Sequence, residues 1–306
     1  MGKITISGFY DEISGSLSKQ IAVLHELGER YMCPRNIDGK NIADYTFEEF
    51  EKDVYPTLKK EGIKFSSIGS PIGKVGIDDE EGFAKQKQQL AELVKIAQLM
   101  KCEYIRIFSF FYGDKKPEDC SAKVISRLKE LLAIVKGSGV KLMHENEKRI
   151  YGDVPSRVLE IYNAINDDDF VLCFDASNYI QCDVNPTEAF DTLKYLVVYY
   201  HIKDCSTYKV EVPVGTGEGH YEYIVGQLKA RGYEGFMTLE PHTFKYAVMK
   251  PLVYFVPFVK FAMKDYFKAF RLIDKKMGRN YFACASRKTV FLWQYNNLKK
   301  LISEAK

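Results

Sequence analysis

The sequence predicts an α/β protein, a (β/α)8 barrel in which eight parallel strands alternate with helices. Short apolar runs of strand length recur every ~25–40 residues and are separated by helical patterns, which is the rhythm of this fold. The chain has 306 residues, enough for a barrel of roughly 250 residues and an extension. The alternative, an open doubly wound sheet, usually has a glycine-rich turn after its first strand, and residues 9–13 contain no glycine.

Hydrophobic periodicity and helix end signals define the first half of the barrel. Strands are expected at residues 4–9, 30–34, 63–68 and 104–108, and helices at residues 17–27, 46–62, 79–100 and 121–136. Gly28 ends the first of these helices, and Thr46 with Glu49 forms a capping box at the start of the second. Pro56 lies inside the second helix and predicts a kink or an early break.

The four strands expected in the second half each end on a side chain that can bind a metal. They are expected at residues 141–145, 170–175, 197–201 and 236–240, with helices at 155–165, 186–195 and 220–231. The side chains at their ends are Glu145, Asp175, His201 and Glu240. Active sites of this barrel lie at the carboxyl ends of the strands. A single acid there is often only a helix cap, but four in equivalent positions indicate a site.

The ligand atoms of these four side chains indicate which metal ions the site could bind. Three carboxylates and one imidazole suit Mn²⁺, Mg²⁺, Co²⁺ or Zn²⁺ and argue against a thiolate site. We expect one divalent metal ion per chain, with Mn²⁺ favoured.

Charge and cysteine content restrict the class of protein. The net charge is +3, but residues 266–306 carry +8 and residues 1–265 carry −5. Seven cysteines include no C-x-x-C pair, which suggests reduced thiols and a cytoplasmic protein; they are residues 33, 102, 120, 173, 182, 205 and 284. We expect no signal peptide, because residues 1–3 lead directly into a strand, and the longest apolar run, residues 251–263, is shorter than the ~20 residues that span a bilayer. We therefore expect no membrane partner.

Six short segments carry a family resemblance. They are F-Y-D-E-I at 9–13, S-P-I-G-K at 70–74, H-E-N-E at 144–147, F-D-A-S-N at 174–178, H-I-K-D at 201–204 and L-E-P-H at 239–242. In these segments the chain resembles the sugar phosphate isomerase/epimerase family, the xylose-isomerase-like barrels, over about residues 4–245. The resemblance implies that Glu145, Asp175, His201 and Glu240 hold the divalent metal.

The resemblance also implies an activity, that of an isomerase or epimerase for a sugar, sugar phosphate or cyclitol. A metal polarises the carbonyl and hydroxyl oxygens of such a substrate and stabilises the enediolate that forms when a base removes a proton. We expect Glu145 and Glu240 to act as the proton-transfer groups as well as ligands. Further candidates for contact with the substrate are Lys74, His144, Asn178, Lys203 and His242.

Two positions depart from the ketose 3-epimerase branch of the family. That branch carries a histidine three residues after the aspartate and an arginine six residues after the histidine, where this chain has Asn178 and Thr207. Asn178, Lys203 and Asp204 are more similar to the branch that includes inosose dehydratases. An inosose-dehydratase-like lyase is therefore the alternative activity.

Other functions fit the residues less well. An endonuclease IV-like phosphodiesterase would need a trinuclear zinc site with many histidine ligands. This chain has only five histidines in all. A non-catalytic binding barrel would be expected to lose a ligand, and none is lost. Residues 215–219 are glycine-rich and precede a helix, but no Lys-Ser/Thr follows, so a flexible loop is favoured over a phosphate site. Arg106, inside a strand, is interpreted as structural.

The C-terminal region is expected to be a second unit. We assign residues 1–265 to the barrel and residues 266–306 to a basic extension that packs on the barrel or on a partner subunit. Its lysines, arginines and aromatics are typical of nucleic-acid surfaces. However, one helical face is apolar at Phe291, Tyr295, Leu298 and Ile302, which favours a packing arm. We expect no nucleic-acid partner and leave a homo-oligomer open.

Overall fold

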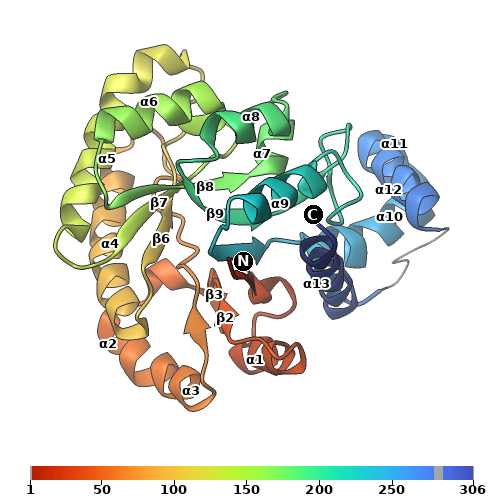
Figure 1. Ribbon diagram of the computed structural model, residues 1–306, viewed down its shortest axis with the longest axis horizontal. Coiled ribbons are helices and arrows are strands. Elements are labelled where there is room, and N and C mark those ends of the chain that lie inside the picture. The colour runs from red at the N-terminus through yellow and green to blue at the C-terminus, as the bar shows by residue number, and fades with distance from the viewer. Residues whose placement is uncertain (1, 279–284, 306) are drawn as a thin grey trace.

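The computed structural model describes residues 2–278 and 285–305 (Figure 1). Eight parallel strands in this part form the barrel: β1 (Ile4–Gly8), β2 (Tyr31–Met32), β5 (Lys64–Phe65), β6 (Tyr104–Ile107), β7 (Lys141–Glu145), β8 (Phe170–Asp175), β9 (Val197–Ile202) and β12 (Gly235–Leu239). Six of them form one sheet in the order β1-β12-β9-β8-β7-β6, and β2 pairs with β5. Isolated contacts complete the ring: Cys33 N donates to Gly8 O, and Ile68 forms a parallel bridge with Ile105 through two bonds, from Ile68 N to Tyr104 O and from Arg106 N to Ile68 O. The predicted barrel is confirmed.

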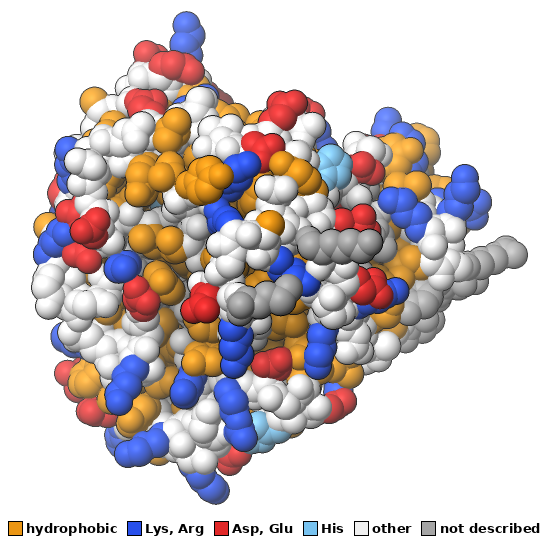
Figure 2. All heavy atoms as spheres, viewed as in Figure 1, with side chains coloured by type: hydrophobic (Ala, Val, Ile, Leu, Met, Phe, Trp, Pro, Cys, Tyr) orange, Lys and Arg blue, Asp and Glu red, His pale blue; other side chains and the backbone are white. Residues whose placement is uncertain are grey.

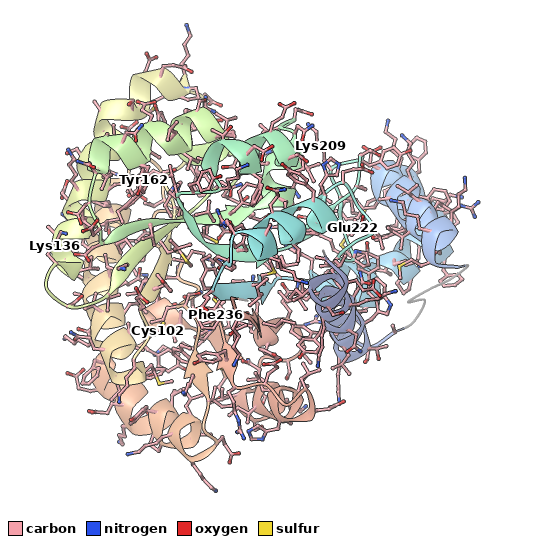
Figure 3. The ribbon with its side chains drawn as sticks, in the orientation of Figure 1. Cys102, Lys136, Tyr162, Lys209, Glu222 and Phe236 are labelled. Carbon is pink, nitrogen blue, oxygen red and sulfur yellow. The ribbon has the colours of Figure 1, made fainter. Side chains whose placement is uncertain are left out.

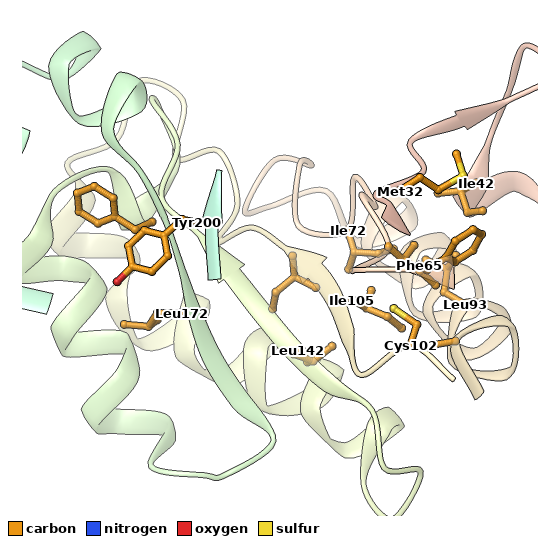
Figure 4. Packing of buried hydrophobic residues seen from close by; sticks show 14 of the residues in the cluster. Met32, Ile42, Phe65, Ile72, Leu93, Cys102, Ile105, Leu142, Leu172 and Tyr200 are labelled. Carbon is orange, nitrogen blue, oxygen red and sulfur yellow. The ribbon is translucent and has the colours of Figure 1, made fainter. Parts of the chain in front are cut away.

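The second and third strands are shorter than the sequence predicts. They were expected at residues 30–34 and 63–68, yet only two residues of each form a ladder. Pro34 has no N–H to donate, and the chain leaves the ladder soon after Cys33. Consequently this side of the barrel is held by few backbone bonds, and packing of Met32, Phe65 and Ile105 in the core contributes to its closure (Figure 4).

The helices that follow the strands cover the outside of the barrel. They are α1 (Leu17–Glu26), α2 (Phe47–Glu49), α3 (Tyr55–Lys60), α4 (Glu80–Met100), α5 (Ser121–Val135), α6 (Pro155–Ile165), α8 (Pro186–Leu193) and α9 (Tyr221–Ala230). All of these helices except α2, which has no buried residue, bury apolar side chains, as α5 does with Leu128, Leu131 and Leu132. The charged residues Lys136, Lys209 and Glu222 lie on the outer surface (Figure 3).

The irregularity expected near Pro56 lies just before that residue. Thr46 caps α2 by accepting a hydrogen bond from Glu49 N at 3.2 Å. A π-helical segment, Phe50–Val54, then joins α2 to α3. Pro56 occupies the first turn of α3, where a missing N–H costs little. The predicted long helix is therefore two short helices with a π-helical turn between them.

Several short elements were not anticipated from the sequence. Two hairpins lie in the loops that follow β2 and β9, and these are β3 (Asn36–Ile37) with β4 (Lys40–Asn41), and β10 (Asp204–Cys205) with β11 (Glu211–Val212). A short helix α7 (Ala176–Gln181) follows Asp175 directly. Short 3₁₀ turns lie at Tyr10–Glu12, Ile42–Asp44, Pro117–Cys120 and Tyr151–Asp153.

The chain after β12 forms a helical lobe beside the barrel (Figure 1). It contains a π-helical turn (Lys245–Met249), α10 (Lys250–Phe255), α11 (Pro257–Ala262), α12 (Lys264–Met277) and α13 (Arg287–Glu304). Tyr246, Val253, Phe270 and Val290 form a small core of its own. On α13, Phe291, Tyr295 and Leu298 are buried in the core of the barrel, and Ile302 packs against it.

The six cysteines in the described part of the chain are free thiols, and all except Cys182 are buried. Cys284 lies outside the described residues. Cys102 belongs to the apolar packing between α4 and β6 (Figure 4). Among the described helices, none has the length and apolar character needed to cross a membrane.

Candidate metal centre

The site begins with the alternation of side chains along four strands. In β7, β8, β9 and β12, every second residue points into the barrel. Met143, Cys173 and Tyr199 form a buried cluster inside it. Tyr199 also donates a hydrogen bond from its hydroxyl to Ser66 Oγ at 2.8 Å. Two residues further along these strands come Glu145, Asp175 and His201, and on β12 Glu240 follows the buried Thr238 in the same way, so the four side chains point inward above a packed floor.

A bulge brings Asp175 level with His201. Leu172 pairs with Val197, but the next pair along β8 and β9 is Cys173 with Tyr199, so Val198 is left out of the pairing. Asp175 therefore lies beside His201. Without the bulge, Asp175 would lie beside Tyr200, whose side chain points the other way. The bulge is thus required for the two candidate ligands to meet.

The four side chains converge as predicted. Glu145, Asp175, His201 and Glu240 are buried, and each offers a donor atom within 4.8 Å of the others. His201 Nδ1 is 2.9 Å from Glu145 Oε1 and 3.9 Å from Glu240 Oε2. Asp175 Oδ2, Glu240 Oε2 and both ring nitrogens of His201 are buried and make no hydrogen bond of good geometry within the described part of the chain, although Lys203 Nζ lies close to both carboxylates. Buried polar atoms nearly always make hydrogen bonds, so these converging oxygen and nitrogen atoms fit a bound cation.

One cation lies next to each carboxylate. Arg106 Nη1 is 3.2 Å from Glu145 Oε2, Lys203 Nζ is 3.0 Å from Asp175 Oδ2, and Arg35 Nη1 is 3.4 Å from Glu240 Oε1. These contacts offset the cost of burying three negative charges together. Lys203, predicted to contact a substrate, therefore lies within the cluster, 3.7 Å from Glu240 Oε2.

The carboxylates differ in how tightly they hold a proton. Burial would raise the pKa of Glu145, but His201 and Arg106 outweigh it and lower the pKa to about 2. Burial raises the pKa of Asp175 to about 8, and Lys203 opposes this only in part. Burial also acts on Glu240, but Lys203, His242 and Arg35 hold its pKa well below the usual range. Glu145 and Glu240 are therefore the carboxylates most firmly held in the ionised form.

Two asparagines position the first two ligands. Asn146 Oδ1 accepts a hydrogen bond from Asp175 N, and its Nδ2 donates to Asp175 O, both at 2.9 Å. Asn178 Nδ2 donates to Asn146 O at 2.8 Å and to Glu145 Oε1 at 3.4 Å. Asn178, predicted to bind substrate, is thus occupied with the ends of β7 and β8.

The other three residues predicted to contact a substrate lie outside the four-residue cluster. His242 Nε2 lies 3.8 Å from Glu240 Oε1, and Glu12, Glu240 and His242 form a second group that could hold an ion. Lys74 pairs with Glu147 at 2.9 Å and is outside the four-residue cluster. His144 is buried and stacks on Phe170, with ring centroids 6.0 Å apart, because its position in β7 alternates with that of Glu145. The expectation that His144 contacts substrate therefore finds no support in its position.

The glycine-rich loop at 215–219 does not present a free phosphate site. Gly215 N and Gly217 N donate to Asp204 Oδ2, and Gly219 N donates to Asp204 Oδ1, each at 2.9 Å. The buried carboxylate of Asp204 therefore already accepts the hydrogen bonds of the backbone N–H groups that a phosphate would use. The loop is held in place by Asp204, which differs from the flexible loop that the sequence suggested.

The sequence analysis did not identify Arg35, although Arg35 carries the same signal as the candidate ligands, a polar side chain at the end of a strand. Arg35 follows the second strand as the ligands follow theirs. It lines a cavity of about 310 Å³ with Asp11, Glu12, His242 and Arg287, among others. Because Arg35 and His242 also approach Glu240, this cavity borders the cluster. Its size lies at the lower end for small-molecule sites.

Residues 21–252 match the sequence family described as the xylose isomerase-like TIM barrel. The chain belongs to this family. Solved structures similar to this xylose isomerase-like barrel include the IolI protein with a bound zinc atom, with a TM-score of 0.70 and 14% identity over 99% of each chain. A second is an L-ribulose 3-epimerase, with a TM-score of 0.68 and 14% identity over 100% of this chain and 96% of that one.

A third similar structure is the probable 3-DHS dehydratase AsbF of Bacillus anthracis. Its TM-score is 0.62, with 16% identity over 78% of this chain and 93% of that one. At these identities the likeness is evidence for the fold alone. No curated protein matches the sequence. The predicted family resemblance is confirmed, and the reaction of this xylose isomerase-like barrel has to be argued from its site.

Proposed function

We propose that the protein is a divalent-metal-dependent isomerase or epimerase that acts on a small sugar, sugar phosphate or cyclitol. The observation that carries this proposal is the convergence of buried ligand atoms of Glu145, Asp175, His201 and Glu240 within 4.8 Å of one another, at the carboxyl ends of barrel strands. A set of carboxylates and one imidazole matches Mn²⁺, and Mg²⁺, Co²⁺ or Zn²⁺ are alternatives. The similar structures named for an epimerase and for a bound zinc atom agree with this class.

A metal at this site would polarise the substrate's carbonyl and hydroxyl oxygens and make the neighbouring C–H more acidic. The protein's own part is to move the proton. The strands that lead to Glu145 and Glu240, β7 and β12, are separated by β8 and β9 in the sheet. The two carboxylates therefore approach a substrate from different directions. One can accept a proton and the other can return one to the opposite face or to the adjacent carbon.

Besides the metal ligands and the two proton-transfer groups, the proposed site contains Lys203. Its ammonium group is buried between Asp175 and Glu240, and it can donate a hydrogen bond to a substrate oxygen that gains negative charge. The cavity beside Arg35 and His242 would give a small polyol access to the cluster. Arg287 also lines this cavity and could meet a phosphorylated substrate, whereas Arg35 and Lys245 there already pair with carboxylates.

The test compares Glu145→Gln and Glu240→Gln with the natural protein. Each variant keeps the size of the side chain but removes the proton acceptor, so turnover should fall ~10²–10⁴-fold. NMR in D₂O, with a panel of ketoses, cyclitol ketones and their phosphates, would follow exchange and product together. For an epimerase, one variant should still exchange the substrate α-hydrogen without inverting the centre. For a one-base isomerase, one variant should lose exchange entirely.

Glu147→Gln is the matched control, because Glu147 pairs with Lys74 outside the cluster. It should retain turnover. If both cluster variants keep near-normal rates, the two-carboxylate mechanism is wrong, and Lys203 becomes the next candidate for the base.

A dehydratase is the second candidate, and the position of Lys203 favours it. Loss of water from a cyclitol or sugar needs a group that can protonate the departing hydroxyl, and a buried ammonium next to the ligands can do so. The same NMR assay separates the two reactions. An unsaturated or deoxy-carbonyl product identifies the dehydratase, whereas an isomeric product of equal mass identifies the isomerase or epimerase.

A further inference from the structure

The C-terminal extension contributes one side chain, Arg287 of α13, to the cavity that borders the four-residue cluster. The residues matched by the family end at 252, so the matched part of the barrel does not supply this arginine. Lysine and arginine side chains are scattered over the face of the molecule drawn in Figure 2, and a positive charge at the surface does not by itself indicate a site. The position of Arg287 and the charges around it distinguish it from the others.

The helical repeat of α13 directs Arg287 toward the segment that follows β12. Phe291 and Gln294 follow Arg287 by four and seven residues, so the three side chains lie on one face of the helix. Phe291 is buried in the barrel core, and Gln294 donates a hydrogen bond to Pro241 O at 2.9 Å. In agreement, the guanidinium carbon of Arg287 lies 5.4 Å from the centre of the Phe244 ring. Arg287 is nevertheless exposed, so a molecule that enters the cavity can reach it.

The two other lysine and arginine side chains that line the cavity already have carboxylate partners. Arg35 Nε is 3.0 Å from Asp11 Oδ2, and Lys245 pairs with Glu211. Arg287 forms no ion pair with a carboxylate of residues 2–278 and 285–305. A guanidinium is always charged in proteins and carries five N–H donors. Of these three cations, Arg287 is therefore the one whose donors are open to a ligand.

The acidic side chains of the cavity do not need Arg287 as a counter-charge. Asp11 Oδ2 accepts hydrogen bonds from Arg35 Nε at 3.0 Å and from Asn36 Nδ2 at 2.8 Å. Glu12 Oε2 accepts a hydrogen bond from Thr243 N at 2.9 Å. Both carboxylates are largely buried. A purely structural role for Arg287, as the partner of either carboxylate, finds no support in these contacts.

A neutral polyol in the cavity would leave Arg287 without a charged partner, whereas an anionic group would supply one. We infer that the substrate carries a phosphate or carboxylate group and that Arg287 binds this group through the bidentate hydrogen bonds that a guanidinium offers to such oxygens. The cavity reaches from Arg287 to His242, whose Nε2 lies 3.8 Å from Glu240 Oε1, so the opposite end of the substrate meets the cluster. This inference rests on the proposed function, because it takes the cavity as the place where the sugar or cyclitol binds.

The experiment measures binding, which does not depend on turnover. Isothermal titration of the protein supplemented with Mn²⁺ compares inositol and neutral polyols of five and six carbons with their monophosphates, and with aldonic acids of the same carbon number. None of these compounds has a ketone or aldehyde group to isomerise. We expect at least one anionic compound to bind ~10–100-fold more tightly than its neutral counterpart, the range for hydrogen bonds to a charged group. The phosphates and the aldonic acids separate the two kinds of anion.

The variants test whether this preference comes from Arg287. Arg287→Gln should abolish most of the preference for the anion, and Arg287→Lys, which keeps the charge but not the bidentate geometry, should retain part of it. The matched control is Lys288→Gln, because Lys288 is the neighbouring cation and pairs with Glu26 at 2.5 Å. This control should retain the full preference. Circular dichroism checks that each variant is folded.

Two results would overturn the inference. No anionic compound of the panel binds more tightly than its neutral counterpart, or the preference survives in Arg287→Gln. Failure of the proposed function gives a different result. If the preference depends on Arg287 but the D₂O assay finds neither exchange nor product, the anion site stands and the isomerase or epimerase activity is wrong. If neutral sugars are turned over and no anion is preferred, the activity stands and the role of Arg287 is wrong.

Discussion

Gln294 on α13 donates a hydrogen bond from Nε2 to Pro241 O at 2.9 Å, and Pro241 directly follows the candidate ligand Glu240. The same fully buried side chain accepts a bond at Oε1 from Val214 N, at 3.3 Å. One glutamine near the C-terminus therefore links the loop after β12 to the loop after β9, which carry Glu240 and Lys203. Gln294 lies outside the residues matched by the family, which end at 252.

This link predicts that Gln294→Met weakens metal binding without removing a ligand. Methionine keeps the volume but leaves Val214 N and Pro241 O unpaired, at a cost of ~1–3 kcal/mol for each group. Residues that support metal ligands typically change affinity by ~10–100-fold, and we expect the lower end of this range. Isothermal titration with Mn²⁺ measures the effect. Asn297→Ala, which removes a bond to Val214 O alone, should affect Mn²⁺ less; equal losses in the two variants contradict a specific role of the Pro241 bond.

The four-residue cluster predicts about one divalent ion per chain. Elemental analysis of the purified protein and reconstitution after chelation would measure it. Asp175→Ala removes one of the four proposed ligands and should therefore lower metal affinity by orders of magnitude. Asp183→Ala, at an exposed position paired with Lys209, is the control. Unchanged affinity in Asp175→Ala means that the ligand set is wrong.

Arg106 is expected to be essential for folding of the site. It is buried, and besides Glu145 it donates to the carbonyl oxygens of Gly69 at 3.1 Å and Ser70 at 3.3 Å. Arg106→Met leaves the Glu145 carboxylate buried without this partner, which should lower the free energy of unfolding by ~3–5 kcal/mol. Urea denaturation measures it. Lys136→Met, which breaks exposed ion pairs with Asp167 and Asp169, should change stability by only about 1 kcal/mol or less, so a similar loss in both variants argues against this account.

Deletion of residues 266–306 tests the role of the C-terminal extension. It removes Phe291, Tyr295 and Leu298 from the barrel core, each of which stabilises by ~1.5–3 kcal/mol, and exposes the apolar surface beneath them. We expect a lower unfolding temperature or aggregation, measured by calorimetry and light scattering. Tight, salt-sensitive binding of DNA or RNA by the intact protein, lost in the truncated one, would instead identify a nucleic-acid surface.

Local pattern was sufficient to predict the barrel and the four candidate ligands. Apolar runs of strand length end on Glu145, Asp175, His201 and Glu240, and parallel strands of a barrel present such ends at one rim. Lys203 and Asn178 were predicted in the same way, because each lies just after one of these strands. For these residues, position along a strand is enough to determine position in space, because every strand of the barrel runs in the same direction.

Other features depend on contacts between segments that are distant in sequence. The bulge at Val198 aligns Asp175 with His201, but a pairing register is a property of two strands and cannot be read from either alone. Asp204 accepts hydrogen bonds from backbone N–H groups of the loop at 215–219, and Gln294 donates to Pro241 O from a separate helix. His144 is adjacent to a ligand in sequence, yet it packs on Phe170, because alternation turns it to the other face of its strand. The sequence alone therefore determined which side chains reach the rim, while tertiary packing decided how they are aligned and supported, because those contacts form only when the barrel and the C-terminal helix are assembled.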